Sequence, residues 1–182
     1  LRVLGVAGPP VAVFELFYGL AGADFLVVLH GGHVSLGSMS RTLVALSDRW
    51  DLQDLVTRYA TCIDSRDFDG LDWVFTPQAR VSYEASGGPD DTYPVVRAWL
   101  AEMLPIFAAT QHLMGNLEVR LDGDAATGRC MCFNPMALRP IEEKDQQVFF
   151  YGLWYRLEFV RTGDGWRIAR LTQEQAFHHN LP

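Results

Sequence analysis

Two residues in this chain, Asp64 and His112, are of types suited to moving a proton. Histidine is the side chain whose charge changes nearest neutral pH, so it can take a proton from carbon or oxygen and return it. A carboxylate can hold one ring nitrogen of a histidine, which fixes its tautomer and stabilises the imidazolium. Each residue also has a structural interpretation, because Asp64 could cap a helix and His112 could be a satisfied strand residue.

Motifs for several other reaction classes are missing from the sequence. It contains no Gly-rich phosphate loop, no nucleophile elbow and no paired-cysteine metal motif, which disfavours nucleotide, serine hydrolase and zinc chemistry. His178 and His179 are adjacent, so on an extended chain their side chains point apart and make a poor metal site. We therefore expect neither a metal nor a cofactor.

The composition favours a globular protein that binds a small molecule. Of the 182 residues, 49% are hydrophobic and 12% aromatic, which is enough for a real core. The net charge of -7 argues against nucleic acid or an anionic membrane as partner. Cys62, Cys130 and Cys132 form no even disulfide framework, so we expect buried, reduced thiols and a cytoplasmic location.

The first 38 residues differ from the rest, being apolar, glycine-rich and without a regular period. The run over 11–29 is interrupted by acidic residues and glycines and falls short of a membrane span, although Arg2 could be the basic end of a signal peptide. Met39 begins a polar stretch that leads into a helix. We expect 1–38 to be a leader, non-native or from a misassigned start, and 39–182 to be the folded domain.

Helical periodicity dominates the first half of this domain. We expect a helix capped by Ser47 or Asp48, then a shorter helix over 68–75 that is stopped by Thr76 and Pro77, and a third helix over 94–107. The apolar stripe of the first helix consists of Leu52, Leu55, Val56, Tyr59 and Ile63. That of the third consists of Val95, Trp99, Met103 and Phe107.

Strand patterns appear over 79–85 and throughout the chain after Thr110. Turn signals at 121–124 and 161–165 separate long runs, and a loop covers 87–91. The sequence therefore predicts an α+β fold in which three helices pack on a strongly curved antiparallel sheet and enclose one pocket.

Four stretches together resemble the SnoaL-like branch of the nuclear transport factor 2 (NTF2-like) superfamily, nearest to scytalone dehydratase. They are RYATCIDSRDFDGL at 58–71, ARVSY at 79–83, TQH at 110–112 and GWRIA at 165–169. The resemblance covers about residues 45 to 175 and implies a cone-shaped α+β barrel. It also implies a homo-oligomer, dimer or trimer, to which Val119, Leu121 and Leu157 would contribute from the outer sheet face.

The resemblance implies roles for individual residues. In scytalone dehydratase a helix carboxylate orients a catalytic histidine, and the matching positions are Asp64 and His112. Tyr83 matches a tyrosine that helps hold a water against the substrate carbonyl and so stabilises an enolate. Ile63 and Met136 stand where the dehydratase has a second tyrosine and a second histidine, which puts that particular dehydration in doubt and implies a more apolar substrate.

We expect the pocket wall to combine helix and sheet residues. From the helices we expect Tyr59, Ile63, Trp99, Met103 and Phe107, and from the sheet Asn134, Met136 and Tyr155. An apolar stripe at helical spacing is also typical of plain core. Asn134 and Tyr155 are therefore the stronger candidates for ligand contact.

Together these features favour an acid–base enzyme without cofactor, a dehydratase, isomerase or cyclase acting on a hydrophobic cyclic or polyketide-like ketone. One alternative is a non-catalytic binding or structural module, such as a ring-hydroxylating dioxygenase small subunit. Another is an epoxide hydrolase, which needs a second carboxylate and an arginine, and Glu158 and Arg156 leave this open.

Overall fold

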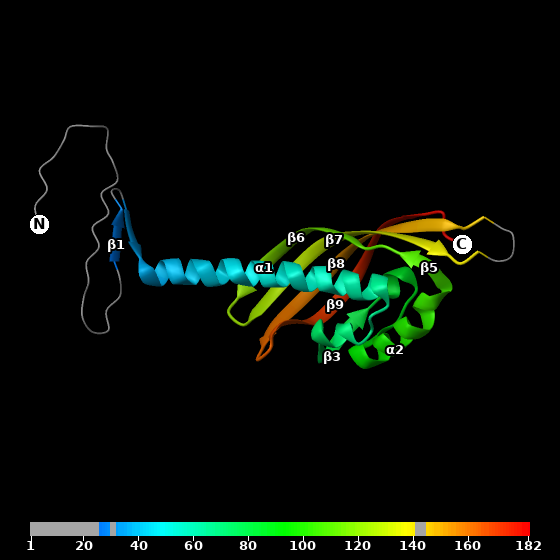
Figure 1. Ribbon diagram of the computed structural model, residues 1–182, viewed down its shortest axis with the longest axis horizontal. Coiled ribbons are helices and arrows are strands. Elements are labelled where there is room, and N and C mark those ends of the chain that lie inside the picture. Colours follow the sequence, from blue (N-terminus) through cyan, green and yellow to red (C-terminus); the bar gives the residue numbers. More distant parts are fainter. Residues whose placement is uncertain (1–25, 30–31, 141–144) are drawn as a thin grey trace, which may run out of the picture. The chain divides into compact units, whose positions relative to one another are not determined.

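The structure is a computed structural model that describes residues 26–29, 32–140 and 145–182 (Figure 1). The chain divides into two compact units, residues 1–48 and 49–182. Most of the expected leader lies outside the described residues. Within it, strand β1 (Leu26–Leu29) pairs antiparallel with β2 (Gly32–Ser35). The residues of the candidate site all belong to the second unit.

Helix α1 extends over Leu36–Ser65, so the expected start at Ser47 or Asp48 was wrong. The eleven residues before Ser47 contain no proline that would stop a helix. A single polar residue such as Ser47 can also stand inside a helix without marking its start. The predicted apolar stripe is confirmed, because its five members are all at most 3% exposed. This stripe joins the helix to the core of the second unit.

The helix predicted over 68–75 is absent from the described structure. A single 3₁₀ turn, η1 (Gly70–Trp73), is followed by strand β3 (Phe75–Ser82), so Thr76 and Pro77 are extended. Gly70 weakens any α-helix here. Leu71, Val74 and Phe75 are nevertheless buried, and Phe75 pairs with Ile168 of a distant strand.

The third helix is shorter than expected, and its buried face is shifted by one residue from the predicted one. After the turn η2 (Glu84–Ser86) and strand β4 (Asp90–Thr92), helix α2 covers Tyr93–Met103 and continues as the 3₁₀ turn η3 (Leu104–Ile106). Its buried residues are Tyr93, Val96 and Leu100, whereas Val95 is half exposed. The predicted stripe, which begins at Val95, and the observed stripe, which begins at Val96, both have helical spacing. The observed one is buried because α2 packs against β3.

Five further strands complete a seven-stranded sheet. They are β5 (Phe107–Thr110), β6 (Leu113–Asp122), β7 (Ala125–Leu138), β8 (Val148–Thr162) and β9 (Gly165–His179). The order is β4-β3-β9-β8-β7-β5, with β6 also paired to β7. The pair β3–β9 is parallel, whereas the other pairings of this sheet are antiparallel as expected. Both predicted turns are confirmed, with Gly123 and Gly165 at positive φ.

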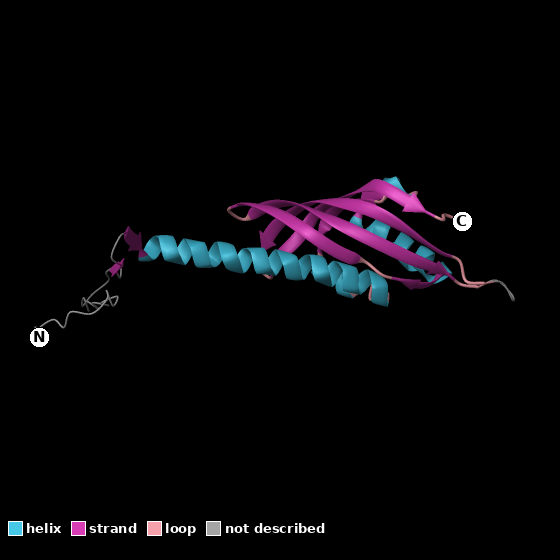
Figure 2. Ribbon diagram, turned by 90° about the horizontal axis from the view of Figure 1, so that it is seen from above, coloured by secondary structure: helices cyan, strands magenta, loops and turns pink. Residues whose placement is uncertain are grey.

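The long strands curve, and the sheet does not close (Figure 2). Its inner face shares one core with α1 and α2, which confirms the α+β cone expected from the sequence. Val119, Leu121 and Leu157 pack against this core and not on the outer face, because alternate residues of a strand face opposite sides of the sheet and these three face inward. Cys62, Cys130 and Cys132 are buried and unpaired, as expected.

Among the described residues, no helix combines the length and hydrophobicity needed to cross a membrane.

Candidate active site

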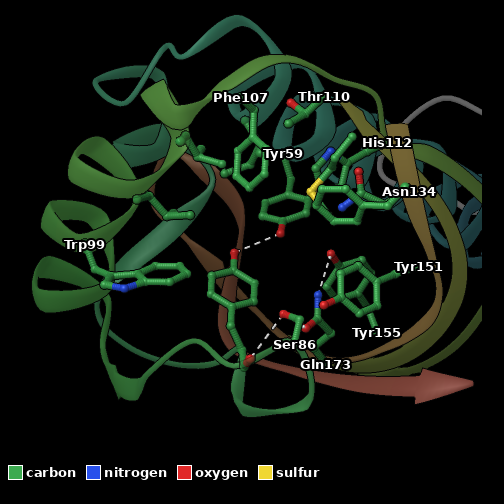
Figure 3. A pocket seen from close by; sticks show the side chains of 16 residues that line it. Tyr59, Ser86, Trp99, Phe107, Thr110, His112, Asn134, Tyr151, Tyr155 and Gln173 are labelled. Atoms are coloured by element: carbon green, nitrogen blue, oxygen red, sulfur yellow. Dashed lines mark hydrogen bonds between the residues drawn. The ribbon is translucent and has the colours of Figure 1, made fainter. Parts of the chain in front are cut away.

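A pocket of about 150 Å³ opens between the helices and the inner face of the sheet (Figure 3). It contains nearly all of the residues that the sequence suggested. Met103 is the one predicted wall residue that does not line it, because α2 turns Trp99 and Leu100 toward the cavity instead. The sixteen lining residues are Tyr59, Ile63, Tyr83, Ser86, Trp99, Leu100, Leu104, Phe107, Thr110, His112, Asn134, Met136, Phe149, Tyr151, Tyr155 and Gln173.

Asp64 and His112 form a hydrogen-bonded pair at the edge of this pocket. Asp64 lies in the last turn of α1, and His112 lies between β5 and β6. His112 Nδ1 is 2.7 Å from Asp64 Oδ1, and the backbone N–H of His112 donates to Asp64 Oδ2 at 2.7 Å. Because Nδ1 is engaged by the carboxylate, Nε2 is the ring nitrogen left for a ligand.

Thr110 and Arg66 complete the support of this carboxylate. The Thr110 hydroxyl donates to Asp64 Oδ1 at 3.0 Å and accepts a hydrogen bond of 2.7 Å from the Arg66 guanidinium. The same guanidinium donates to the carbonyl of Ile63 at 2.7 Å, so it also caps the end of α1. Arg66 has φ 64, a left-handed conformation that turns the chain out of the helix.

The charge of Asp64 is stabilised by these contacts. Partial burial of the carboxyl would by itself raise its pKa, but the hydrogen bonds and charge of His112 and the hydroxyl of Thr110 outweigh this effect and hold the pKa below its ordinary value. The carboxylate therefore stays ionised and accepts from the Nδ1–H of His112. Such an arrangement leaves the lone pair of the neutral imidazole on Nε2.

Tyrosine hydroxyl groups form the second polar feature of the pocket. Tyr59 and Tyr83 share a hydrogen bond of 2.8 Å between their hydroxyl oxygens. Gln173 Nε2 donates to the Tyr155 hydroxyl at 3.3 Å, and Ser86 donates to Gln173 Oε1 at 2.5 Å. In Figure 3 the hydroxyls of Tyr59 and Tyr155 both point into the cavity. These groups can donate hydrogen bonds to a ligand oxygen.

Burial keeps the three tyrosines neutral. It raises the pKa of Tyr59, Tyr83 and Tyr155 well above the ordinary value for a phenol, because the ionised form would lose its hydration. A buried neutral phenol is a donor that can stabilise an oxyanion as charge develops on a substrate.

Sequence reasoning missed several wall residues, and three of them share one origin. Phe149, Tyr151 and Gln173 are the cross-strand partners of three predicted residues: Met136, Asn134 and Tyr155 respectively. Directly opposite residues share a face of the sheet, so these three could be identified only once the strand register was known. Ser86 reaches the pocket from the turn η2 and carried no recognisable sequence signal.

Residues considered for other chemistries lie elsewhere. Arg156 and Glu158 are exposed on the outer face of β8, where they pair with Glu174 and Arg170. His178 and His179 are exposed near the end of β9. Within the described ranges, no three His, Cys, Asp or Glu side chains gather as a metal-binding group.

Residues 44–172 of the chain match the SnoaL-like domain. Two mycobacterial relatives are each 46% identical over 136 residues, a stretch that covers 75% of this chain and 90% of theirs. They are the uncharacterized proteins Rv2910c of Mycobacterium tuberculosis and Mb2934c of Mycobacterium bovis.

Solved structures share the fold. The Kfla4162 protein of Kribbella flavida is 26% identical with a TM-score of 0.68, and the match covers 75% of this chain and 95% of that one. A scytalone dehydratase-like protein of Novosphingobium aromaticivorans is 15% identical with a TM-score of 0.68, covering 78% and 92%. The hexachlorocyclohexane dehydrochlorinase LinA-type3 of Novosphingobium barchaimii is 20% identical with a TM-score of 0.64, covering 77% and 94%.

Proposed function

We propose that this chain, which belongs to the SnoaL-like domain family, is an acid–base enzyme. It acts without a cofactor on a hydrophobic cyclic or polyketide-like ketone. The observation that carries this proposal is the 2.7 Å contact between His112 Nδ1 and Asp64 Oδ1 at the wall of an aromatic pocket. A histidine held in this way is a base aimed at a bound molecule.

The proposed reaction begins with proton removal by His112. Nε2 takes a proton from the carbon next to the substrate carbonyl, and the electrons of the C–H bond move to the carbonyl oxygen to give an enolate. The hydroxyl of Tyr83, supported by Tyr59, donates to that oxygen, while Asp64 stabilises the imidazolium. The proton then returns to another carbon in an isomerisation, or goes to a leaving group in an elimination.

The named activities of two structural neighbours are compatible with this chemistry. Scytalone dehydratase and hexachlorocyclohexane dehydrochlorinase are both named for eliminations, in which a proton and a leaving group depart from neighbouring carbons. Because the identities are low, these neighbours support the reaction class only through the shared fold. The proposal therefore depends on the Asp64–His112 pair.

Exchange of carbon-bound hydrogen tests the proposal without knowledge of the substrate. An enolisable ring ketone such as 1-tetralone is incubated with the protein in D₂O, and loss of its α-proton signal is followed by NMR. We expect the wild type to accelerate exchange and His112→Gln to lower the accelerated rate by about 10²- to 10⁴-fold. His179→Gln, the same change at an exposed residue outside the pocket, is the matched control.

The alternative function has a distinct outcome in this experiment. A non-catalytic binding module would bind ring ketones, seen as shifts of pocket resonances, without accelerating exchange. Acceleration that survives in His112→Gln would also contradict the proposal, because another group would then be the base.

The homo-oligomer expected from the sequence stays a prediction. On the outer face of the sheet, Leu113, Phe133 and Phe177 are exposed and lie in one register row across β6, β7 and β9. Light scattering of the purified protein would determine its mass in solution, with Phe133→Ser as the variant expected to weaken association.

A further inference from the structure

Asn134 is the unusual polar residue of the pocket wall. It lies on β7 opposite Tyr151 and is only 6% exposed. Its Oδ1 has no hydrogen-bond partner, and it is the one buried side-chain oxygen or nitrogen of this kind in the described part of the chain. The neighbouring chain is the His112 segment, since the backbone of Gln111 donates to the carbonyl of Pro135 at 3.1 Å.

An unpartnered buried acceptor lowers stability. Almost all buried polar atoms in proteins have a partner, and leaving one unpaired costs the free energy of removing it from water. Several other polar side chains around the cavity do have hydrogen-bond partners. Ser86 pairs with Gln173, Tyr59 with Tyr83, and Thr110 with Asp64. A leucine of similar size would avoid this cost at position 134, so the amide needs another reason.

The chemistry of Asn134 Oδ1 determines which ligand group can bind to it. A carbonyl-type oxygen accepts, so the ligand must donate. None of the sixteen lining residues is Asp, Glu, Lys or Arg, and a cationic ammonium group would therefore lack a counter-ion inside the pocket. A neutral hydroxyl is the donor that fits. The volume of about 150 Å³ is that of cavities known to hold a single six-membered ring, with the open side free for more.

We propose that Asn134 selects a substrate whose ring carries a hydroxyl group, which donates to Asn134 Oδ1. This proposal rests on the proposed function, because it names the substrate class of the same pocket. The tyrosine hydroxyls supply donors for the ketone, and Asn134 supplies an acceptor for the hydroxyl. A hydroxylated ring ketone is thereby bound in one orientation beside His112, whereas an unsubstituted ketone can bind in several.

A matched ligand series tests the selection by binding alone. Dissociation constants are measured by NMR titration for 1-tetralone and for its 5-, 6- and 7-hydroxy and methoxy derivatives. We expect at least one hydroxyl isomer to bind roughly tenfold more tightly than the unsubstituted ring. The corresponding methoxy compound should lose this advantage, because its oxygen accepts but cannot donate.

Two variants separate this proposal from the proposed function. Asn134→Leu should abolish the hydroxyl preference and raise the Tm by about 2–4 °C, since it removes an unsatisfied buried group. His112→Gln should lose hydrogen exchange yet keep the preference. If the wild type catalysed no exchange, a retained preference would still support the role of Asn134.

Three results would overturn the proposal. Equal binding of the hydroxylated and unsubstituted rings would mean that no donor is recognised. Methoxy compounds that bind as tightly as hydroxyl compounds would mean that the amide presents its NH₂ group. A Tm of Asn134→Leu below that of the wild type would mean that the amide stabilises the fold itself.

Discussion

Replacing Asp64 by asparagine should reverse the tautomer of His112. The carboxylate accepts the backbone N–H of His112 at Oδ2 and Nδ1–H at Oδ1, both at 2.7 Å. An asparagine amide has only one oxygen, so it can accept only one of these donors. The backbone N–H cannot change, and we expect the amide oxygen to remain there. The NH₂ group then faces Nδ1, which must give up its proton to accept from it.

The consequence for catalysis follows from the position of the lone pair. In the variant the proton sits on Nε2, so the nitrogen that faces the pocket is no longer a base. Loss of a positioned general base lowers a rate by about 10²- to 10⁴-fold. The two hydrogen bonds that Oδ1 accepts, from His112 Nδ1–H and from the Thr110 hydroxyl, are also lost, and because the Asp64 side chain is 24% exposed we expect a stability loss of only about 1–2 kcal/mol.

The assay is a ¹⁵N–¹H correlation spectrum of histidine-labelled protein at a pH where the ring is neutral. The chain has five histidines, and His112→Gln assigns the relevant signals. The wild type should show the Nδ1–H form and Asp64→Asn the Nε2–H form. The reasoning would be refuted if the variant kept the wild-type tautomer, or if hydrogen exchange of the ketone continued at the wild-type rate after the tautomer had changed.

Two further predictions concern stability. Because the folded-state pKa of Asp64 lies below its ordinary value of about 3.9, its contribution is fully present above about pH 5 and is lost as the pH falls through the folded-state pKa. The free energies of unfolding of the wild type and Asp64→Asn, measured in urea, should therefore converge as the pH falls below about 4, and a constant difference would contradict this. Arg66 has φ 64, so Arg66→Gly should be more stable than Arg66→Ala by about 1 kcal/mol, although both lose the guanidinium that caps α1. Equal unfolding midpoints for these two variants would show that the left-handed residue is not strained.

Local patterns in the sequence predicted the local parts of the structure. The stripe from Leu52 to Ile63 depends only on helical periodicity, and the turns at Gly123 and Gly165 depend on a few adjacent residues. The helix predicted over 68–75 was wrong because Phe75 pairs with a residue on β9, far along the chain. Periodicity over so short a run cannot distinguish a helix from a buried strand when the partner is unknown.

Strand register explains why part of the pocket wall was not predicted. Counting pairs back from the turn at Gly165 correctly places Phe159 opposite Ile168. The register then shifts by one residue at a bulge, so that Tyr155 pairs with Gln173 and not with Thr172. A bulge of this kind depends on the curvature of the whole sheet and leaves no clear sequence signal. The contribution of Gln173 therefore had to come from the structure.

One rigid element carries both halves of the proposed chemistry. Tyr59 and Asp64 lie on the same helix, α1, and a slide of one residue would move each by about 1.5 Å. Such a slide would break the 2.8 Å contact with Tyr83 and the 2.7 Å contact with His112 together. A movement of α1 therefore changes both contacts at once. Relatives that acquire new substrates should therefore vary the sheet side of the cavity, at Asn134 and its neighbours, while the helix side changes little.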